Sequence, residues 1–477
     1  MSLATLPGSV QDRHPEEAVR RVETAAPGSM RRVLVANRGE IAVRVIRACR
    51  ELDLETVLVH SEADHDSLAV RLADRAVCIG PARSSQSYLN AEFIVSAALT
   101  QQADAIHPGY GFLSENAAFA ALCEREGLTF IGPRAEVIAM MGDKVRAREL
   151  AAEAGVPVTP GSTGSLADAG QAKAIAATLG YPVLLKAAAG GGGRGMRVVQ
   201  RAEDLSEQFQ DAAREAKAAF GDDALYVEKY LANIRHIEIQ VLGDGETVLH
   251  LGERDCSIQR RNQKLLEESP SPVLDEDARR RMGEAAVRLC RHVGYTSAGT
   301  VEFMLDARSG QFYFMEMNTR IQVEHPVTEM VTGIDLVKAQ LRIAQGIPLA
   351  CKQEDIQLRG HAIECRINAE DFENGFAPCP GTVQRFHAPG GAGVRVDSQL
   401  FSGYTVPPYY DSLVAKVITW GQDRPEAIAR MRGALSEMEI SGIKTTIPFH
   451  LALLRNEAFL QGDVHTRFVE SVMLEGR

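Results

Sequence analysis

An alternation of apolar runs with an amphipathic helical pattern at residues 31–60 most strongly limits the folds open to this chain. The stretch RRVLVANRGEIAVRVIRACRELDLETVLVH reads as a buried strand, a turn, a helix and a second buried strand. Ile41, Val45 and Ala48 recur at helical spacing. Similar alternation up to about residue 135 predicts a small Rossmann-like domain with a parallel sheet. The pattern GxGxxG is missing from this unit, so a dinucleotide role is unsupported.

A chain of 477 residues is too long for one hydrophobic core. The predicted pattern of helices and strands changes twice along the rest of the sequence. Residues 141–348 mix helices with strands and predict an α+β domain with mixed or antiparallel pairing. Residues 349–477 predict a β-rich C-terminal domain closed by helices. We therefore expect an α/β and α+β protein with domains at 31–140, 141–348 and 349–477, preceded by a disordered arm at 1–30.

Charge and cysteine usage narrow the classes of partner. A formal net charge of −11 argues against nucleic acid or an anionic membrane as the main partner. No apolar run approaches the roughly 18 residues of a membrane span. The 8 cysteines have neither CxxC nor zinc-ligand spacing. This pattern is typical of reduced thiols, and we expect a cytoplasmic protein.

The run LLKAAAGGGGRGMRVV is a candidate phosphate-binding loop. It places Gly192 and Gly193 between two apolar stretches, with Lys186 at its entry. Backbone N–H groups can approach a phosphate closely in such a loop because no Cβ intervenes. The loop is not a Walker A motif, since GK[ST] is missing and no helix follows. A flexible hairpin turn is the alternative, and Lys186 with the acidic residues downstream favours the phosphate lid.

The stretch FMEMNTRIQVEHP carries hydrogen-bonding side chains at every second position from Glu316 to Glu324. As one extended strand it would place Arg320 and Glu324 on the same face as Glu316, an arrangement for an anion and a base beside a metal. The preceding run TVEFML predicts a hairpin that brings Glu302 close to Glu316 and Asn318. Such oxygen ligands suit Mg²⁺ or Mn²⁺ rather than zinc. A half-buried strand with a solvated polar face is the alternative.

Three further segments hold weaker candidates. SIQRRNQK interleaves amides with cations, including Asn262 and Lys264, which indicates either anion binding or a solvated charge run. The backbone of YVEKYL at residues 226–231 could pair with an adenine edge or could be an ordinary strand. His236 in RHIEIQV is by itself more typical of a surface histidine whose hydrogen bonds are satisfied than of a histidine that binds a ligand.

Taken together, these stretches resemble the biotin carboxylase family of the ATP-grasp superfamily. The resemblance covers about residues 31–470, and its runs are ANRGEIA, HPGYGFLSEN, MGDK, GGGGRGM, EKYL, RHIEIQVL, ERDCSIQRRNQK, EMNTRIQVEHPVTEMVTG, RGHAIECRINAED and GYTVPPYYDS. The chain departs from the family pattern at Asn262, where many members have His. It also departs at Ala189, where the family's glycine run begins. Neither departure removes a charged group.

The resemblance implies ATP-dependent carboxylation of biotin by bicarbonate, with a mobile glycine-rich lid at about 159–231. It implies that ATP is held by Lys144, Lys186, Gly192, Gly193, Glu228, Lys229, Tyr230, Leu231, His236 and Asn262. Two Mg²⁺ or Mn²⁺ ions would bind to Glu302, Glu316 and Asn318, and bicarbonate to Lys264, Arg320 and Val323. Glu324 would be the base, Arg366 would stabilise the biotin enolate, and Tyr110 would border the biotin ring.

The partners also follow from the resemblance. No AMKM-type biotinyl lysine occurs, so the biotin is expected on a biotin carboxyl carrier protein or on a later module of a longer polypeptide. Carboxyltransferase subunits and a second copy in a homodimer are expected as well. The final acceptor is expected to be acetyl-CoA, with propionyl-CoA or another acceptor left open.

Two other interpretations stay open from the sequence. Another ATP-grasp ligase could form an acyl phosphate for an amine acceptor, but the wider superfamily does not carry the RGHAIECRINAE run. A nucleotide-binding scaffold without chemistry is disfavoured by the intact Arg320, Glu324 and Lys264. A biotin-dependent ATPase assay with bicarbonate would separate the three.

Overall fold

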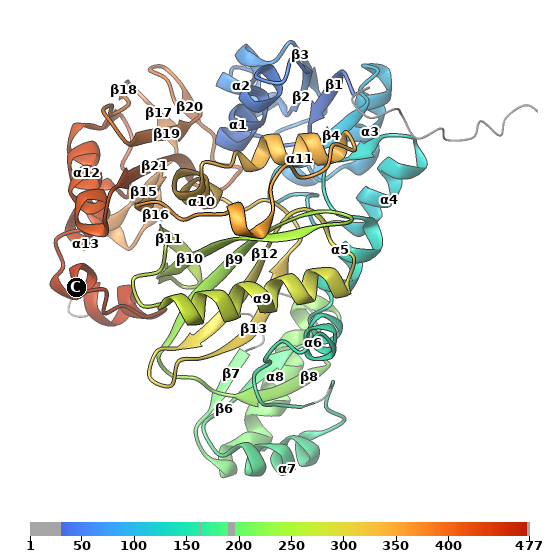
Figure 1. The fold of residues 1–477 in the computed structure, drawn as a ribbon, viewed down its shortest axis with the longest axis vertical. Coiled ribbons are helices and arrows are strands. Elements are labelled where there is room, and N and C mark those ends of the chain that lie inside the picture. Colours follow the sequence, from blue (N-terminus) through green and yellow to red (C-terminus); the bar gives the residue numbers. More distant parts are fainter. Residues whose placement is uncertain (1–29, 163, 189–195, 475–477) are drawn as a thin grey trace, which may run out of the picture.

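The N-terminal part of the chain is a parallel α/β unit. The computed structural model describes residues 30–162, 164–188 and 196–474 (Figure 1). Its first sheet has the order β3-β2-β1-β4-β5 with parallel pairing throughout. The strands are β1 (Arg32–Val35), β2 (Glu55–His60), β3 (Arg75–Cys78), β4 (Ala105–His107) and β5 (Thr129–Phe130). The helices are α1 (Gly39–Arg50), α2 (Leu68–Leu72), α3 (Ala91–Thr100), α4 (Ala117–Arg125) and α5 (Ala135–Gly142). The predicted Rossmann-like unit is confirmed, and Ile41, Val45 and Ala48 are buried.

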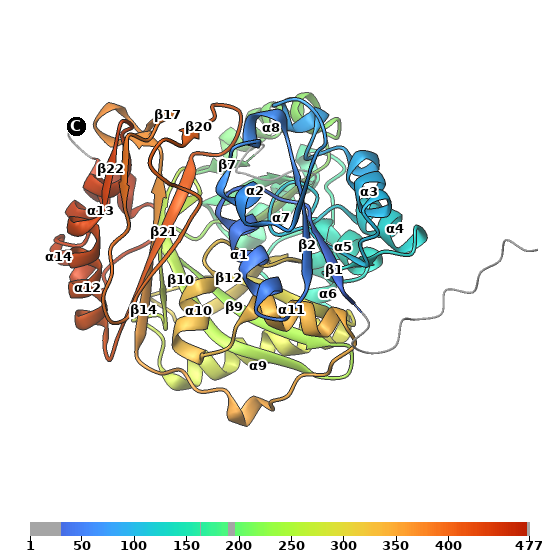
Figure 2. The ribbon, with the colours of Figure 1, turned by 90° about the horizontal axis from the view of Figure 1, so that it is seen from above.

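An eight-stranded antiparallel sheet forms the centre of the molecule, in the order β13-β12-β9-β10-β11-β14-β21-β19. Its first five strands are β9 (Ile234–Asp244), β10 (Val248–Arg260), β11 (Gln263–Ser269), β12 (Thr296–Asp306) and β13 (Gln311–Asn318). The others are β14 (His361–Asn368), β19 (Val394–Ser398) and β21 (Leu413–Gly421). Helix α9 (Glu276–His292) packs on β9 and β10. The sheet therefore runs across the predicted boundary at residue 348, as Figure 2 shows for β14 and β21 beside β10.

A smaller sheet projects from this centre and occupies the lower part of Figure 1. It has the order β7-β6-β8, with β6 (Val183–Ala187), β7 (Met196–Val199) and β8 (Leu225–Lys229). Helices α7 (Ala169–Leu179) and α8 (Leu205–Phe220) accompany it. Strands β6 and β7 pair antiparallel, as predicted for a hairpin around the glycine run. Ala189, Gly192 and Gly193 lie outside the described residues, as does nearly all of the predicted arm.

The prediction of one extended strand from Glu316 to Glu324 is wrong beyond Asn318. Strand β13 ends at Asn318, and a turn leads from it into α10 (His325–Thr332). Pro326 in the first turn of α10 favours a helix there because its φ is preset for the helical conformation. The side chains of the turn meet buried cations instead of solvent, since Arg254 Nη2 donates to Gln322 Oε1 at 2.8 Å.

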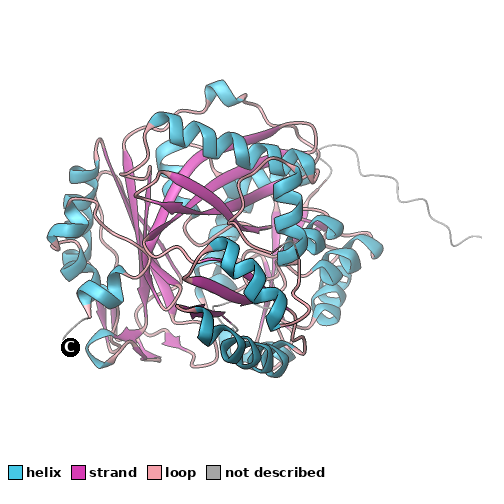
Figure 3. Ribbon diagram, turned by 90° about the horizontal axis from the view of Figure 1, so that it is seen from below, coloured by secondary structure: helices cyan, strands magenta, loops and turns pink. Residues whose placement is uncertain are grey.

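The remaining elements close the outside of the molecule, and Figure 3 shows helices along much of its periphery with strands in the interior. The helices are α6 (Lys144–Glu153), α11 (Leu336–Ala344), α12 (Arg424–Glu437), α13 (Ile447–Leu453) and α14 (Glu457–Leu460). The short strands are β15 (Glu370–Asp371), β16 (Ala377–Pro378), β17 (Gly381–Thr382), β18 (Arg385–His387), β20 (Thr405–Val406) and β22 (Glu439–Ser441). Among the residues described, no helix has both the length and the apolar character required to cross a bilayer.

Candidate active site

A cleft of about 850 Å³ lies where the N-terminal unit, the central sheet and the small sheet meet. It brings together most of the residues selected from the sequence. On its lining are Tyr110, Lys144, Lys186, His236, Asn262, Lys264, Glu302, Glu316, Asn318, Arg320, Val323, Glu324 and Arg366. Of the predicted nucleotide residues that the structure describes, four are not on this lining, namely Glu228, Lys229, Tyr230 and Leu231.

Glu228 lies next to the cleft and contacts Lys186, which is on the lining. Its Oε2 accepts from Lys186 Nζ at 3.0 Å, and its Oε1 accepts from Arg148 Nη1 at 2.6 Å. Lys229 turns away, because its Nζ donates to Gly180 O at 2.8 Å. The side chain of Glu228 therefore fixes the ammonium of Lys186, whereas the side chain of Lys229 fixes the end of a helix.

The β12–β13 hairpin places two carboxylates side by side, as predicted. Glu302 is opposite Glu316 in the register, and Asn318 is opposite Thr300. Asn318 Nδ2 also donates to Glu302 Oε1 at 2.9 Å. Burial and the neighbouring Glu302 raise the pKa of Glu316, while Lys144 opposes this shift with its Nζ 4.0 Å from Glu316 Oε2.

This pair of carboxylates fits a divalent cation. Both carboxylates offer the hard oxygen ligands that Mg²⁺ prefers. Burial and the negative charge of Glu302 disfavour the ionised form of Glu316, and a bound Mg²⁺ would stabilise that form. Asn318 Oδ1 already accepts from Arg320 Nη2 at 2.8 Å, so the amide has one lone pair left for an ion.

Lys264 connects three buried carboxylates on the other side of Glu302. Its Nζ donates to Glu238 Oε2 at 2.5 Å, to Glu324 Oε1 at 2.7 Å and to Glu302 Oε1 at 3.0 Å. Burial opposes the charge on Lys264, but Glu238, Glu302 and Glu324 together raise its pKa well above the ordinary value. An ammonium thus occupies the centre of this acidic group, which favours the Glu316 side for a metal ion.

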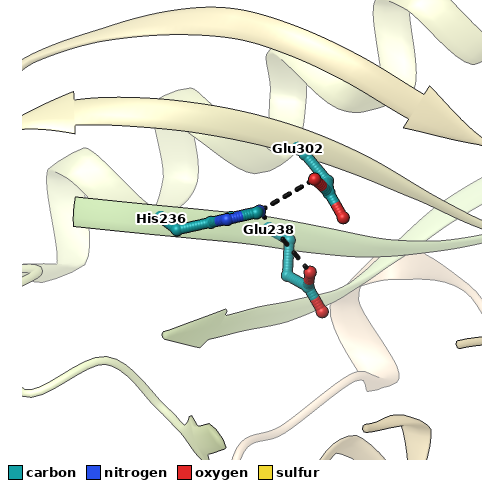
Figure 4. Close-up of side chains that lie close together, drawn as sticks. All are labelled: His236, Glu238 and Glu302. Atoms are coloured by element: carbon teal, nitrogen blue, oxygen red, sulfur yellow. Dashed lines mark ion pairs between the residues drawn. The ribbon is translucent and has the colours of Figure 1, made fainter. Parts of the chain in front are cut away.

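His236 and Glu238 project from β9 toward Glu302 on β12 (Figure 4). His236 Nε2 lies 2.8 Å from Glu302 Oε2 and 4.0 Å from Glu238 Oε2. His236 is therefore a buried cleft residue and not a surface histidine. Glu238 was missed from the sequence, although its spacing of two from His236 on a strand placed it on the same face.

Glu324 is buried and paired with two cations. Its Oε1 accepts from Lys264, and its Oε2 accepts from Arg366 Nη2 at 2.9 Å. Burial alone would raise the pKa of Glu324, but Lys264, Arg366 and Arg254 hold it well below the ordinary value. The group is a carboxylate at neutral pH and can accept a proton.

Two guanidinium groups flank Glu324, and each is held by a carboxylate that was missed from the sequence. Arg320 Nε donates to Glu115 Oε2 at 2.8 Å, and Arg366 Nε donates to Glu267 Oε1 at 2.6 Å. Burial raises the pKa of Glu267 to about 7, against the attraction of Arg366. Both carboxylates are more than 90 positions from their partners, so no local pattern indicates the contacts.

Tyr110 and Val323 also lie on the lining of the cleft. Tyr110 donates its hydroxyl hydrogen to Glu40 Oε1. The carbonyl oxygen of Val323 accepts from Lys416 Nζ at 2.8 Å.

Comparison with known families agrees with this geometry. Residues 143–352 match the family described as carbamoyl-phosphate synthase L chain, ATP binding domain, which places the chain among the ATP-grasp ligases. Residues 29–138 match the biotin carboxylase N-terminal domain, and residues 364–471 match the biotin carboxylase C-terminal domain. The chain belongs to the biotin carboxylase family and is an enzyme of that family.

Individual relatives match nearly the whole chain. Biotin carboxylase 1 of Bacillus subtilis is 58% identical over 94% of this chain and 100% of its own. A crystal structure of a biotin carboxylase–β,γ-ATP complex from Campylobacter jejuni has a TM-score of 0.89 at 50% identity, covering 92% of this chain and 98% of that one. The biotin carboxylase domain dimer of 2-oxoglutarate carboxylase from Hydrogenobacter thermophilus, with MgADP, ADP and bicarbonate, has a TM-score of 0.88 at 54% identity, covering 92% and 97%.

Proposed function

We propose that this cleft activates bicarbonate with ATP and transfers the carboxyl group to biotin on a separate carrier protein. The observation that carries the proposal is the convergence of Glu324 with Lys264, Arg366 and the Glu302–Glu316 pair in one cleft. Phosphoryl transfer to a carbonate oxygen requires carboxylates that hold a divalent ion, a base that takes the bicarbonate proton, and cations that neutralise the developing charge. This cleft contains residues suited to each of these roles.

We assign ATP to the side of the cleft lined by Lys144, Lys186, His236 and Asn262. Lys186 is held by Glu228 and would neutralise phosphate charge once ATP is bound. A divalent ion held by Glu302, Glu316 and Asn318 would supply further neutralisation of the transferring phosphoryl group.

Bicarbonate would bind between Arg320, Lys264 and the backbone of Val323. Its O–H proton passes to Glu324, and the resulting carbonate oxygen attacks the γ-phosphorus of ATP as the bond to ADP breaks. The product is carboxyphosphate. A shift of Lys264 toward the phosphoryl group would remove the strongest attraction that lowers the pKa of Glu324 and would make that carboxylate a stronger base.

Biotin would lie near Arg366 and Tyr110. Carboxyphosphate splits into CO₂ and phosphate, phosphate takes the N1′ proton of biotin, and the nitrogen attacks CO₂. Arg366 would stabilise the negative charge that develops on the ureido oxygen. The proposal is supported by the contact of this guanidinium with the proposed base, since Arg366 Nη2 donates to Glu324 Oε2 at 2.9 Å.

The direct test supplies the purified protein with ATP, Mg²⁺, bicarbonate and free biotin. We expect ADP release that requires bicarbonate and rises on addition of biotin, with carboxybiotin as product. ADP release that needs neither would contradict the proposal. Acyl phosphate trapped by an amine would favour another ligase of this superfamily, and complete lack of ATP cleavage would favour a scaffold.

A metal titration tests the hairpin carboxylates. Glu316→Gln replaces a charged ligand with a neutral amide, so the Mg²⁺ concentration for half-maximal rate should rise roughly tenfold, equivalent to about 1.4 kcal/mol of ion binding. Initial rates of ADP release against free Mg²⁺ measure this. Glu284→Gln on the exposed face of α9 is the matched control and should leave the titration unchanged. Equal Mg²⁺ dependence in wild type and Glu316→Gln would remove Glu316 as a ligand.

The acceptor of the second half-reaction needs its own experiment. We propose acetyl-CoA, with a carrier protein and carboxyltransferase subunits as partners, a homodimeric state, and a cytoplasmic location that the free cysteines support. The similar 2-oxoglutarate carboxylase domain makes a 2-oxo acid a real alternative. The biotinylated protein that co-purifies with this chain should be assayed with ¹⁴C-bicarbonate and acetyl-CoA, propionyl-CoA, pyruvate or 2-oxoglutarate. Label transfer to a 2-oxo acid alone would overturn the acetyl-CoA assignment.

A further inference from the structure

A fully buried lysine lies beneath the turn that carries the proposed bicarbonate residues. The side chain of Lys416 is 0% exposed, and its Nζ donates to the carbonyl oxygen of Val323 at 2.8 Å. The same Nζ lies 3.2 Å from Glu40 Oε1 and 4.0 Å from Asp397 Oδ2. One ammonium therefore joins the start of α1, the turn after β13 and the C-terminal strands of the central sheet.

The sheet register fixes where this ammonium lies. Lys416 on β21 is opposite Arg366 on β14 and opposite Asp397 on β19. Directly opposed residues point to the same face of a sheet, so Lys416 and Arg366 share one face. The side chain of Lys416 is thus held within the central sheet, next to the proposed biotin residue.

The charge of Lys416 is maintained by its neighbours. Burial opposes the charged form, but Glu40, Glu364 and Asp397 raise the pKa of Lys416 above its ordinary value. Within the described residues both carboxylate oxygens of Glu364 lack a hydrogen-bond partner, and burial raises the pKa of Glu364 well above its ordinary value although Lys416 opposes this shift.

Two contacts of Lys416 reach residues to which we assign substrates. The Val323 carbonyl belongs to the peptide group that begins Glu324, so a hydrogen bond to that carbonyl fixes the plane of the peptide from which the base projects. The Glu40 carboxylate that contacts Lys416 also accepts the hydroxyl hydrogen of Tyr110. Lys416 therefore connects the Val323–Glu324 peptide on the proposed bicarbonate side of the cleft to the Glu40–Tyr110 pair on the proposed biotin side.

We infer that Lys416 is a positioning residue for bicarbonate activation, which acts by holding the Val323–Glu324 peptide and does not itself contact substrate. This inference rests on the proposed function. It predicts a selective effect, because the nucleotide residues Lys144 and Lys186 have no contact with Lys416 among those seen in the described part of the chain.

The test is Lys416→Met, which keeps the length of the side chain and removes its donor and charge. Loss of a hydrogen bond from a charged donor should raise the KM for bicarbonate about tenfold or more, while the KM for ATP stays within about twofold of wild type. Both are measured as ADP release. KM does not depend on the fraction of protein that is folded, so partial unfolding does not imitate this split. Lys444→Met removes an exposed ammonium paired with Asp371 and should change neither KM.

A second variant covers the case in which Lys416→Met does not fold. Glu40→Gln retains an acceptor for Tyr110 and removes one charge that holds the ammonium, so it should raise the KM for bicarbonate in the same direction but by less. Unchanged bicarbonate KM in the folded variants, or equal rises for bicarbonate and ATP, would overturn the role of Lys416. Wild-type protein without bicarbonate-dependent ATP cleavage would instead overturn the proposed function itself.

Discussion

Replacement of Glu324 by Gln is expected to lower bicarbonate-dependent ATP cleavage by roughly 10²–10⁴-fold, the usual contribution of a general base. The amide keeps the shape of the side chain and can still accept from Lys264 or Arg366, but it cannot take the bicarbonate proton. ATP binding should remain near wild type because the side-chain contacts of Glu324 in the described part of the chain are with Lys264, Arg366 and Cys256, and not with the residues assigned to ATP. The measurements are ADP release against bicarbonate concentration and the ATP-induced rise in Tm.

Glu439→Gln, on an exposed strand where it pairs with Arg385, is the matched control and should retain full activity. Wild-type turnover in Glu324→Gln would show that another group takes the proton. Loss of the ATP-induced rise in Tm together with turnover would show that Glu324 supports the shape of the cleft and not the chemistry alone.

Replacement of Arg366 by Met is expected to separate the two halves of the reaction. Carboxylation of biotin should fall roughly 10²–10³-fold, the loss typical of one preorganised donor to a developing negative charge. Bicarbonate-dependent ATP cleavage without biotin should fall much less, because Arg320 and Lys264 remain. Carboxybiotin and ADP are measured in the same reaction, with Arg385→Met at an exposed position as the control. Equal losses in the two products would assign Arg366 to structure or to ATP chemistry.

The pH dependence of this variant is a further expected result. Arg366 is the second strongest attraction that lowers the pKa of Glu324, after Lys264. Without it the pKa rises, so Glu324 becomes protonated at a higher pH as the solution is acidified. The acid limb of biotin-independent ATP cleavage should therefore move to higher pH in Arg366→Met. An acid limb at the same pH in both proteins would contradict the assignment of Glu324 as the base.

Local patterns predicted the parts of the site that depend on neighbours in the sequence. The β12–β13 hairpin follows from two apolar runs and a turn, so the proximity of Glu302 and Glu316 could be predicted. The same period-two pattern failed beyond Asn318, because α10 begins at His325 with Pro326 in its first turn, and because polar side chains of the turn meet the buried Arg254 and the half-buried Lys264.

Contacts between distant segments could not be predicted in this way. Glu115 holds Arg320 from 205 positions away, and Glu267 holds Arg366 from 99 positions away. Neither glutamate differs in its local sequence from an ordinary surface acid. The pairing of β11 with β14 is equally non-local, so the continuity of the central sheet across the predicted boundary at residue 348 could not be predicted.

The continuous central sheet limits changes in the distance between Lys264 and Arg366. Lys264 lies on β11 and Arg366 on the adjacent β14, so the backbone ladder between these strands sets their spacing. The β7-β6-β8 sheet is separate from the central sheet, so a displacement of the small sheet during the proposed reaction would leave that spacing unchanged. The proposed bicarbonate residue Lys264 and the proposed biotin residue Arg366 would then keep the same spacing through every turnover.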